Sequence, residues 1–231
     1  MNRTPAPIEP TQKTTLDSIL HHIDRVYVLD LNVDIRDFLV TRETCARLGA
    51  DPSRSSVLVK DVSREEVELG LYIDEEDLER LTEVDLASSP MSDSSFELLL
   101  LAIEEVSHFA YLAFSASRER RVTELELELQ AEVDKFVTFA LLHASRNGGR
   151  VPKDLLDRMF SDFTLRPDLD SERRERYTAA SSLASRYCSG VVQSALERDR
   201  GLAPVLAELR SFYRLSQRGK IGRIHDLVYN G

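Results

Sequence analysis

The spacing of apolar residues changes along the chain and divides it into two parts. Helical spacing predicts helices in the first part at 14–29, 42–48 and 75–84. Between the last two of these helices lie two runs rich in Val and Leu, at 56–62 and 67–73, and a short polar link joins them. This arrangement predicts an antiparallel hairpin. Residues 14–86 are therefore expected to form an α/β N-terminal part, preceded by a flexible tail over residues 1–13 that is rich in Pro and Thr.

Beyond residue 95 the apolar positions have the helical period throughout. Helices are expected at about 95–118, 122–146, 152–163, 171–198 and 203–217. The Ser-rich stretch at 87–95 separates this region from the first part and is either a linker or a loop that caps the next helix. The predicted fold class is α+β, with a small, mostly antiparallel sheet packed on or linked to a C-terminal helical bundle at 95–231.

One helix-length stretch, 96–115, is apolar almost all the way round and still carries a line of polar side chains. That line consists of Glu97, Glu104, His108, Tyr111 and Ser115. Helical spacing places these groups along one edge. Burying a carboxylate or an imidazole without a partner costs free energy, so the edge is expected to face another helix or a cleft.

The returning helix can supply the partners of this edge. If the two helices turn back near residue 120, His108 lies opposite Glu132, with Glu128 one turn away. Glu104, His108, Glu128 and Glu132 are therefore a candidate metal site, because helical bundles hold metals with Glu and Glu-x-x-His motifs that face inward. A second Glu-x-x-His pair is absent, so a site for two metals is not expected and a mononuclear site is the remaining form.

The simpler interpretation is a histidine held by a neighbouring carboxylate, which fixes the packing of the helices and performs no chemistry. This interpretation is favoured because one histidine serves the whole cluster. Other acids of the second helix, Glu124 and Asp134, are expected on its solvated face.

Composition limits the class of protein. The net charge is −10, divided into −14 over residues 1–146 and +4 over residues 147–231. Two cysteines suit a reducing compartment, so we expect a cytoplasmic protein, and the longest unbroken apolar run is far shorter than the roughly 20 residues that span a bilayer. Neither a membrane nor a disulfide framework is expected.

A basic face near the C-terminus gives a second candidate site. Its members are Arg210, Arg214, Arg218, Lys220 and Arg223. The three arginines spaced four apart share one helix face, and Phe212 and Tyr213 lie between them. Such a face can bind a polyanion or nucleic acid, or it can cover an acidic surface of a protein.

Motifs that would identify a catalytic activity are absent from the sequence. It contains no nucleophile elbow and no complete phosphate-binding loop. The leading hypothesis is a cytoplasmic binding or adaptor protein that acts through its helical part on another protein or a second copy of itself. The alternatives are a metal-dependent enzyme with the Glu/His cluster and, less favoured, nucleic-acid or polyanion binding. No cofactor is the first expectation, and a divalent metal is the alternative.

Overall fold

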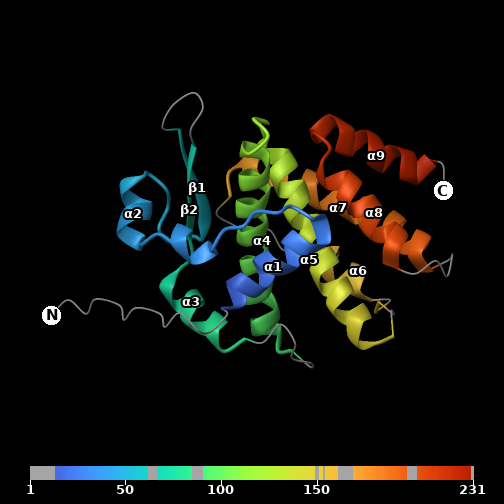
Figure 1. The fold of residues 1–231 in the computed structure, drawn as a ribbon, viewed down its shortest axis with the longest axis horizontal. Coiled ribbons are helices and arrows are strands. Elements are labelled where there is room, and N and C mark those ends of the chain that lie inside the picture. The colour runs from blue at the N-terminus through green and yellow to red at the C-terminus, as the bar shows by residue number, and fades with distance from the viewer. Residues whose placement is uncertain are drawn as a thin grey trace.

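The computed structural model describes residues 14–61, 67–84, 91–148, 151–152, 154–160, 169–196 and 202–229. The tail at 1–13 and residues 87–90 of the Ser-rich stretch lie outside these residues. The α+β fold is confirmed: a two-stranded antiparallel sheet lies near the N-terminus and helices make up the C-terminal part. Figure 1 shows the sheet on one side of the central helix α4 and α7–α9 on the other.

Helix α1, Thr15–Tyr27, begins at a capping box in which Thr14 and Asp17 each bind the other's backbone N–H. Its apolar stripe, which includes Ile19 and Ile23, is buried. The helix ends at Val28, whose φ of 53° places a β-branched residue in the left-handed region. This conformation is rare for valine and carries strain.

Strands β1, Ser56–Asp61, and β2, Val67–Tyr72, pair antiparallel as predicted, with Val57 opposite Leu71. A 3-10 turn at Ile35–Phe38 and a parallel bridge from Leu39 to Leu71 connect this hairpin to α1. The short helices α2, Arg42–Arg47, and α3, Glu75–Thr82, flank the hairpin, and Asp74 at the N-cap of α3 accepts the N–H of Glu76. The sequence pattern therefore predicted the hairpin and both short helices close to where the structure has them.

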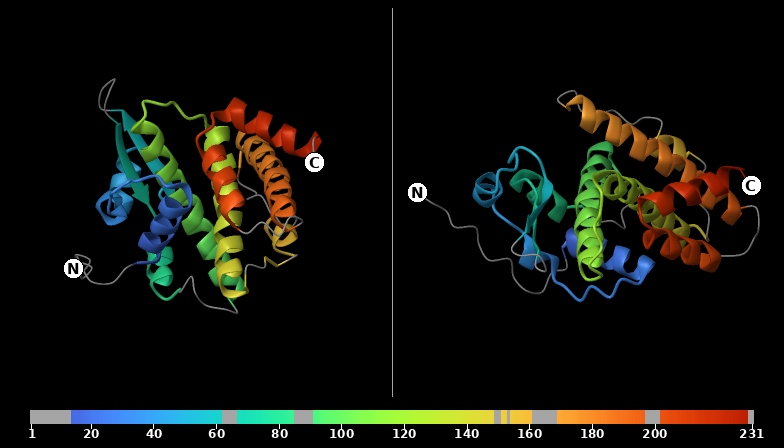
Figure 2. Two further views of the ribbon diagram at one scale, coloured as in Figure 1. Left: turned by 45° about the vertical axis from the view of Figure 1, so that its right-hand side comes forward. Right: turned by 90° about the horizontal axis from the view of Figure 1, so that it is seen from above.

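Helices α4, Asp93–Ala116, and α5, Glu124–Arg146, form the predicted antiparallel hairpin at the centre of the molecule. Figure 2 shows them side by side in both views. Within the described part of the chain, α4 is the one helix long and apolar enough to cross a membrane, and 72% of its most apolar window is buried inside the fold. This burial is typical of a core helix.

Helices α6, Leu155–Phe160, and α7, Ser171–Leu196, pack on α5, and α8, Leu202–Tyr213, packs on α1 and α7. The sequence predicted one final helix at 203–217, but α8 ends at Tyr213 and a further helix, α9, runs over Gln217–Tyr229. Two internal glycines lower its intrinsic helix propensity, which is why the pattern missed it.

One large apolar core runs through both parts of the chain, and Cys45, Leu58 and Tyr72 form a second, small cluster beside the hairpin. The large core joins Ile19 of α1, Leu71 of β2, Phe109 of α4 and Phe212 of α8. Helix α1 packs on α4, α5 and α8, so the N-terminal part supplies a wall of the helical core.

Candidate functional site

The polar edge of α4 faces α5 from Glu104 to Tyr111, as its spacing predicted, whereas Glu97 of the same edge is exposed. His108 is 7% exposed, and its Nε2 lies 3.3 Å from a carboxylate oxygen of Glu128. Its Nδ1 lies 3.8 Å from Glu105, one turn earlier on α4. The expected partner was Glu132, and the register of the two helices places Glu128 there instead. His108 therefore lies between two carboxylates.

The other two predicted residues are held by a lysine that the sequence reasoning did not select. Lys135 of α5 donates to Glu104 at 2.9 Å and to Glu132 at 2.5 Å. We call the six residues together the α4–α5 ion cluster: Glu104, Glu105, His108, Glu128, Glu132 and Lys135. The cluster consists of two cations, each flanked by two carboxylates.

Burial and ion pairing act in opposite directions on the pKa values of this cluster. Burial lowers the pKa of His108, but its contacts with Glu105 and Glu128 outweigh burial and raise it to about 10. For Lys135 the two carboxylates likewise outweigh burial, and its pKa rises. Burial raises the pKa of Glu105 and Glu132. Burial also acts to raise the pKa of Glu104, but the nearby cations Lys135 and His108 outweigh it and lower that pKa. Both cations are thus charged at neutral pH.

This charge state bears on the candidate metal site. A protonated imidazole has no lone pair for a metal, and the ammonium of Lys135 binds Glu104 and Glu132. Among the described residues, no group of three or more His, Cys, Asp or Glu side chains is placed to hold a metal ion. The metal site of Glu104, His108, Glu128 and Glu132 stays a prediction that requires these side chains to rearrange.

A second buried network centres on Asp134, which the sequence analysis placed on a solvated face. That expectation was wrong: Asp134 is 1% exposed. It accepts hydrogen bonds from Tyr27 of α1 at 2.5 Å, from Ser107 of α4 at 2.5 Å and from Gln130 at 2.7 Å. Burial raises its pKa to about 6, against the lowering effect of these donors. Asp134 thus ties three helices together.

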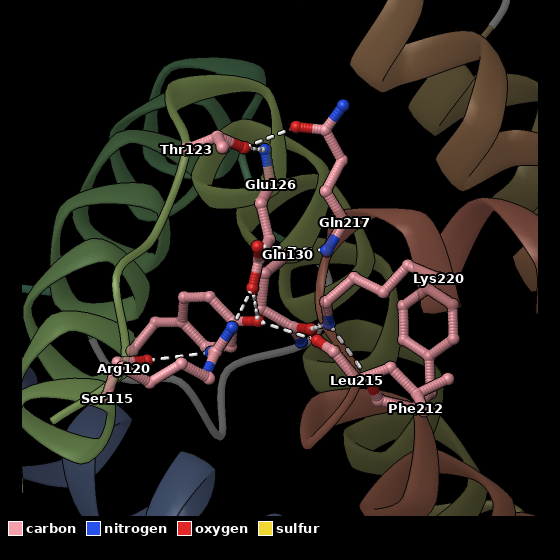
Figure 3. Close-up of polar contacts among 10 residues, drawn as sticks. Ser115, Arg120, Thr123, Glu126, Gln130, Phe212, Leu215, Gln217 and Lys220 are labelled. Atoms are coloured by element: carbon pink, nitrogen blue, oxygen red, sulfur yellow. Dashed lines mark hydrogen bonds and ion pairs between the residues drawn. The ribbon is translucent and has the colours of Figure 1, made fainter. Parts of the chain in front are cut away.

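Lys220 of α9 bonds to Gln130 and so extends this network to the C-terminal helices. Figure 3 shows Lys220 with its neighbours. The side chain is fully buried, and Nζ donates to Gln130 Oε1 at 2.5 Å and to the Phe212 carbonyl at 3.0 Å. Nζ also lies 4.3 Å from the ring centroid of Phe212, 5.0 Å from that of Tyr111 and 5.9 Å from that of Tyr213. Burial lowers its pKa to about 7. We call these groups around Nζ the lysine pocket.

Glu126 of α5 contacts both Tyr111 of the lysine pocket and the first residue of α9. Its carboxylate accepts from the Tyr111 hydroxyl at 2.6 Å. It also accepts from the Gln217 N–H at 2.9 Å and from the Arg120 guanidinium, as Figure 3 shows. Arg120 also donates to Ser115 at 2.8 Å. A carboxylate at a helix N-terminus is favoured by the helix dipole, so Glu126 fixes the start of α9.

The predicted basic face is largely engaged inside the molecule. Arg210 donates to the Val26 carbonyl at 2.9 Å, and Arg214 donates to the carbonyls of Tyr27 and Val28 at 3.1 Å each. These two arginines therefore cap the strained C-terminal end of α1.

The three other members of that face have different surroundings. Arg223 pairs with Glu208, with Nε at 2.9 Å from the carboxylate, and Arg218 is exposed. Lys220 lies in the core and is not part of any surface. The structure thus does not bring the five predicted residues together on one open face.

Comparisons with known proteins give no family, because no protein-family model, curated protein or solved structure matches this chain. The site is therefore interpreted from its own geometry.

Sequence reasoning found Glu104, His108 and Tyr111 because they interrupt an apolar helix. Lys135 and Gln130 were missed, and Lys220 was assigned to an exposed basic face although it lies in the core. The signal for Lys135 was its position three residues after Glu132, on the side that faces Glu104.

Proposed function

We propose that this is a cytoplasmic binding or adaptor protein whose helical part presents a fixed surface to another protein or to a second copy of the chain. The observation that carries this proposal is that the buried ionisable groups of α4 and α5 are paired with one another or hydrogen-bonded. His108 and Lys135 each lie between two carboxylates, and Asp134 accepts three hydrogen bonds. These contacts support a role in fixing the helices, because paired buried charges specify packing.

The engagement of the basic residues supports the same proposal. Arg210 and Arg214 bind backbone carbonyls of α1, so their charges position one helix on another. A rigid arrangement of helices is a suitable scaffold for recognising a partner, because little conformational entropy is lost on binding.

Photo-crosslinking in the native host tests this function. A crosslinking amino acid is placed at exposed positions of the helical part, Arg186 or Arg218, and at matched exposed positions of the N-terminal part, Glu43 or Glu79. We expect discrete, light-dependent adducts from the helical positions, and mass spectrometry then identifies a partner protein or a second copy of the chain. Adducts from the N-terminal positions alone, or from none of the four, would refute the proposal.

A metal-dependent enzyme is the second candidate, because the four residues selected from the sequence do gather in the α4–α5 ion cluster. This candidate requires Lys135 to leave Glu104 and Glu132 and His108 to lose its proton. Elemental analysis of protein purified without chelators tests it. A metal retained by the wild type and lost in His108→Ala would support the enzyme, and equal metal content in the two proteins would reject it.

A further inference from the structure

The lysine pocket has the composition of a binding site for an amine. Three aromatic rings, those of Tyr111, Phe212 and Tyr213, lie within 6 Å of Nζ of Lys220. Ring faces attract cations at such distances, and the attraction is larger where water is excluded. Two oxygens, from the Gln130 amide and the Phe212 carbonyl, accept hydrogen bonds from the same nitrogen. The pocket therefore offers three ring faces and two hydrogen-bond acceptors to the amine that occupies it.

The pocket is held in place by residues other than its occupant. Gln130 donates through Nε2 to Asp134 at 2.7 Å, which turns Oε1 toward the amine. Tyr111 is fixed by its hydrogen bond to Glu126, and its ring lies edge-on to Tyr213 with centroids 4.9 Å apart. Asp134 and Glu126 also place negative charge near the amine. Pre-organised acceptors of this kind lower the cost of binding.

The helix that delivers the amine has a small buried face. Among the α9 side chains whose burial is described, Lys220 and Ile224 are the two that are fully buried. An apolar residue at the centre of the docking face would be the simpler choice, because burying an amine costs free energy. The buried amine of Lys220 is instead compensated by two acceptors and three ring faces from other helices.

We propose that the lysine pocket is a binding site for a primary alkyl amine, which Lys220 fills from within the chain and an external primary amine fills when Lys220 is absent or displaced. A free alkyl amine and the lysine side chain of a protein partner present the same chemistry to the rings and the two acceptors. A quaternary ammonium lacks the N–H groups that Gln130 and the Phe212 carbonyl require, so the pocket discriminates against it.

Chemical complementation in the full-length protein tests this proposal. Lys220→Ala removes Cγ, Cδ, Cε and Nζ, and n-propylammonium replaces those atoms. We expect n-propylammonium to raise the thermal unfolding midpoint of Lys220→Ala saturably, by about 3 °C or more at concentrations well above its Kd. Lys220→Met is the matched control, because its side chain fills the same space and leaves no room for the amine.

The probes separate amine recognition from other effects. We expect n-propanol, tetramethylammonium and sodium chloride to give a much smaller response in Lys220→Ala. Equal responses to n-propanol and n-propylammonium, or equal responses of Lys220→Ala and Lys220→Met, would overturn the proposal. If Lys220→Ala does not fold alone, recovery of its helical circular dichroism by n-propylammonium is the supporting result, and no recovery is the overturning one.

A second arm identifies the source of the amine. Lys220→Ala is titrated with a peptide of residues 216–229 and with the same peptide carrying Met in place of the lysine. Tighter binding of the lysine peptide, by about tenfold or more, assigns the pocket to a lysine presented on a helix. Binding of n-propylammonium without this preference assigns it to free amines. Neither result depends on the crosslinking outcome, so the two proposals can fail separately.

Discussion

Replacing His108 by glutamine is expected to destabilise the protein strongly, because it removes the cation between Glu105 and Glu128. The pKa of His108 rises from 6.5 to about 10 in the fold, and each pKa unit corresponds to about 1.4 kcal/mol, which gives about 5 kcal/mol. Breaking a buried ion pair typically costs about 3–5 kcal/mol. Because the side chain is nearly inaccessible, solvent screening reduces this value little, and we expect a loss of about 3–5 kcal/mol near pH 6.

The pH dependence of this loss has a definite sign. The folded state keeps the proton on His108 at pH values where the unfolded state releases it, because the folded pKa is the higher one. The stabilisation is therefore complete below pH 6.5 and is lost as the pH rises toward 10. The difference in unfolding free energy between wild type and His108→Gln should thus shrink between pH 7 and pH 10.

Urea denaturation followed by circular dichroism, at several pH values from 6 to 10, measures this difference. His21→Gln is the matched control, since His21 is exposed on α1, and it should leave stability within about 0.5 kcal/mol of wild type. A loss below about 1 kcal/mol at pH 6, or a loss that is constant up to pH 10, would refute the argued ion pairing of His108.

Three further changes probe the other contacts. Lys135→Met should lower the free energy of unfolding by about 3–5 kcal/mol, because two carboxylates lose their partner. In a double-mutant cycle, adding Glu132→Gln should recover part of this loss, and additive effects of the two substitutions would contradict the contact. Asp134→Ala should cost about 2–4 kcal/mol in urea denaturation, because buried donors on three helices lose their acceptor, and an unchanged midpoint would show that Asp134 is solvated. Arg214→Ala should lower the free energy of unfolding by about 1 kcal/mol and speed hydrogen exchange at the end of α1. Arg218→Ala, at an exposed position, should do neither, and equal effects of the two substitutions would exclude the capping role.

Sequence periodicity could predict some residues of the candidate site but not how they pair. A polar residue in an apolar helix is visible in the pattern, so His108 and Tyr111 were found. The partner of His108 depends on the register of α4 against α5, and a shift of one helical turn replaces Glu132 by Glu128. A periodicity argument fixes which face of a helix is buried but gives the register only to within about a turn.

The sequence by itself determined where most helices and both strands begin and end, because caps such as Thr14 and Asp74 and the apolar periods act within a few residues. The tertiary structure decided which charged side chains are buried and which are exposed. Asp134 and Lys220 are among the more hydrophilic residues of the chain, and both are buried because partners from other helices compensate their desolvation. Those partners lie up to 107 positions away along the chain, and packing alone brings them together.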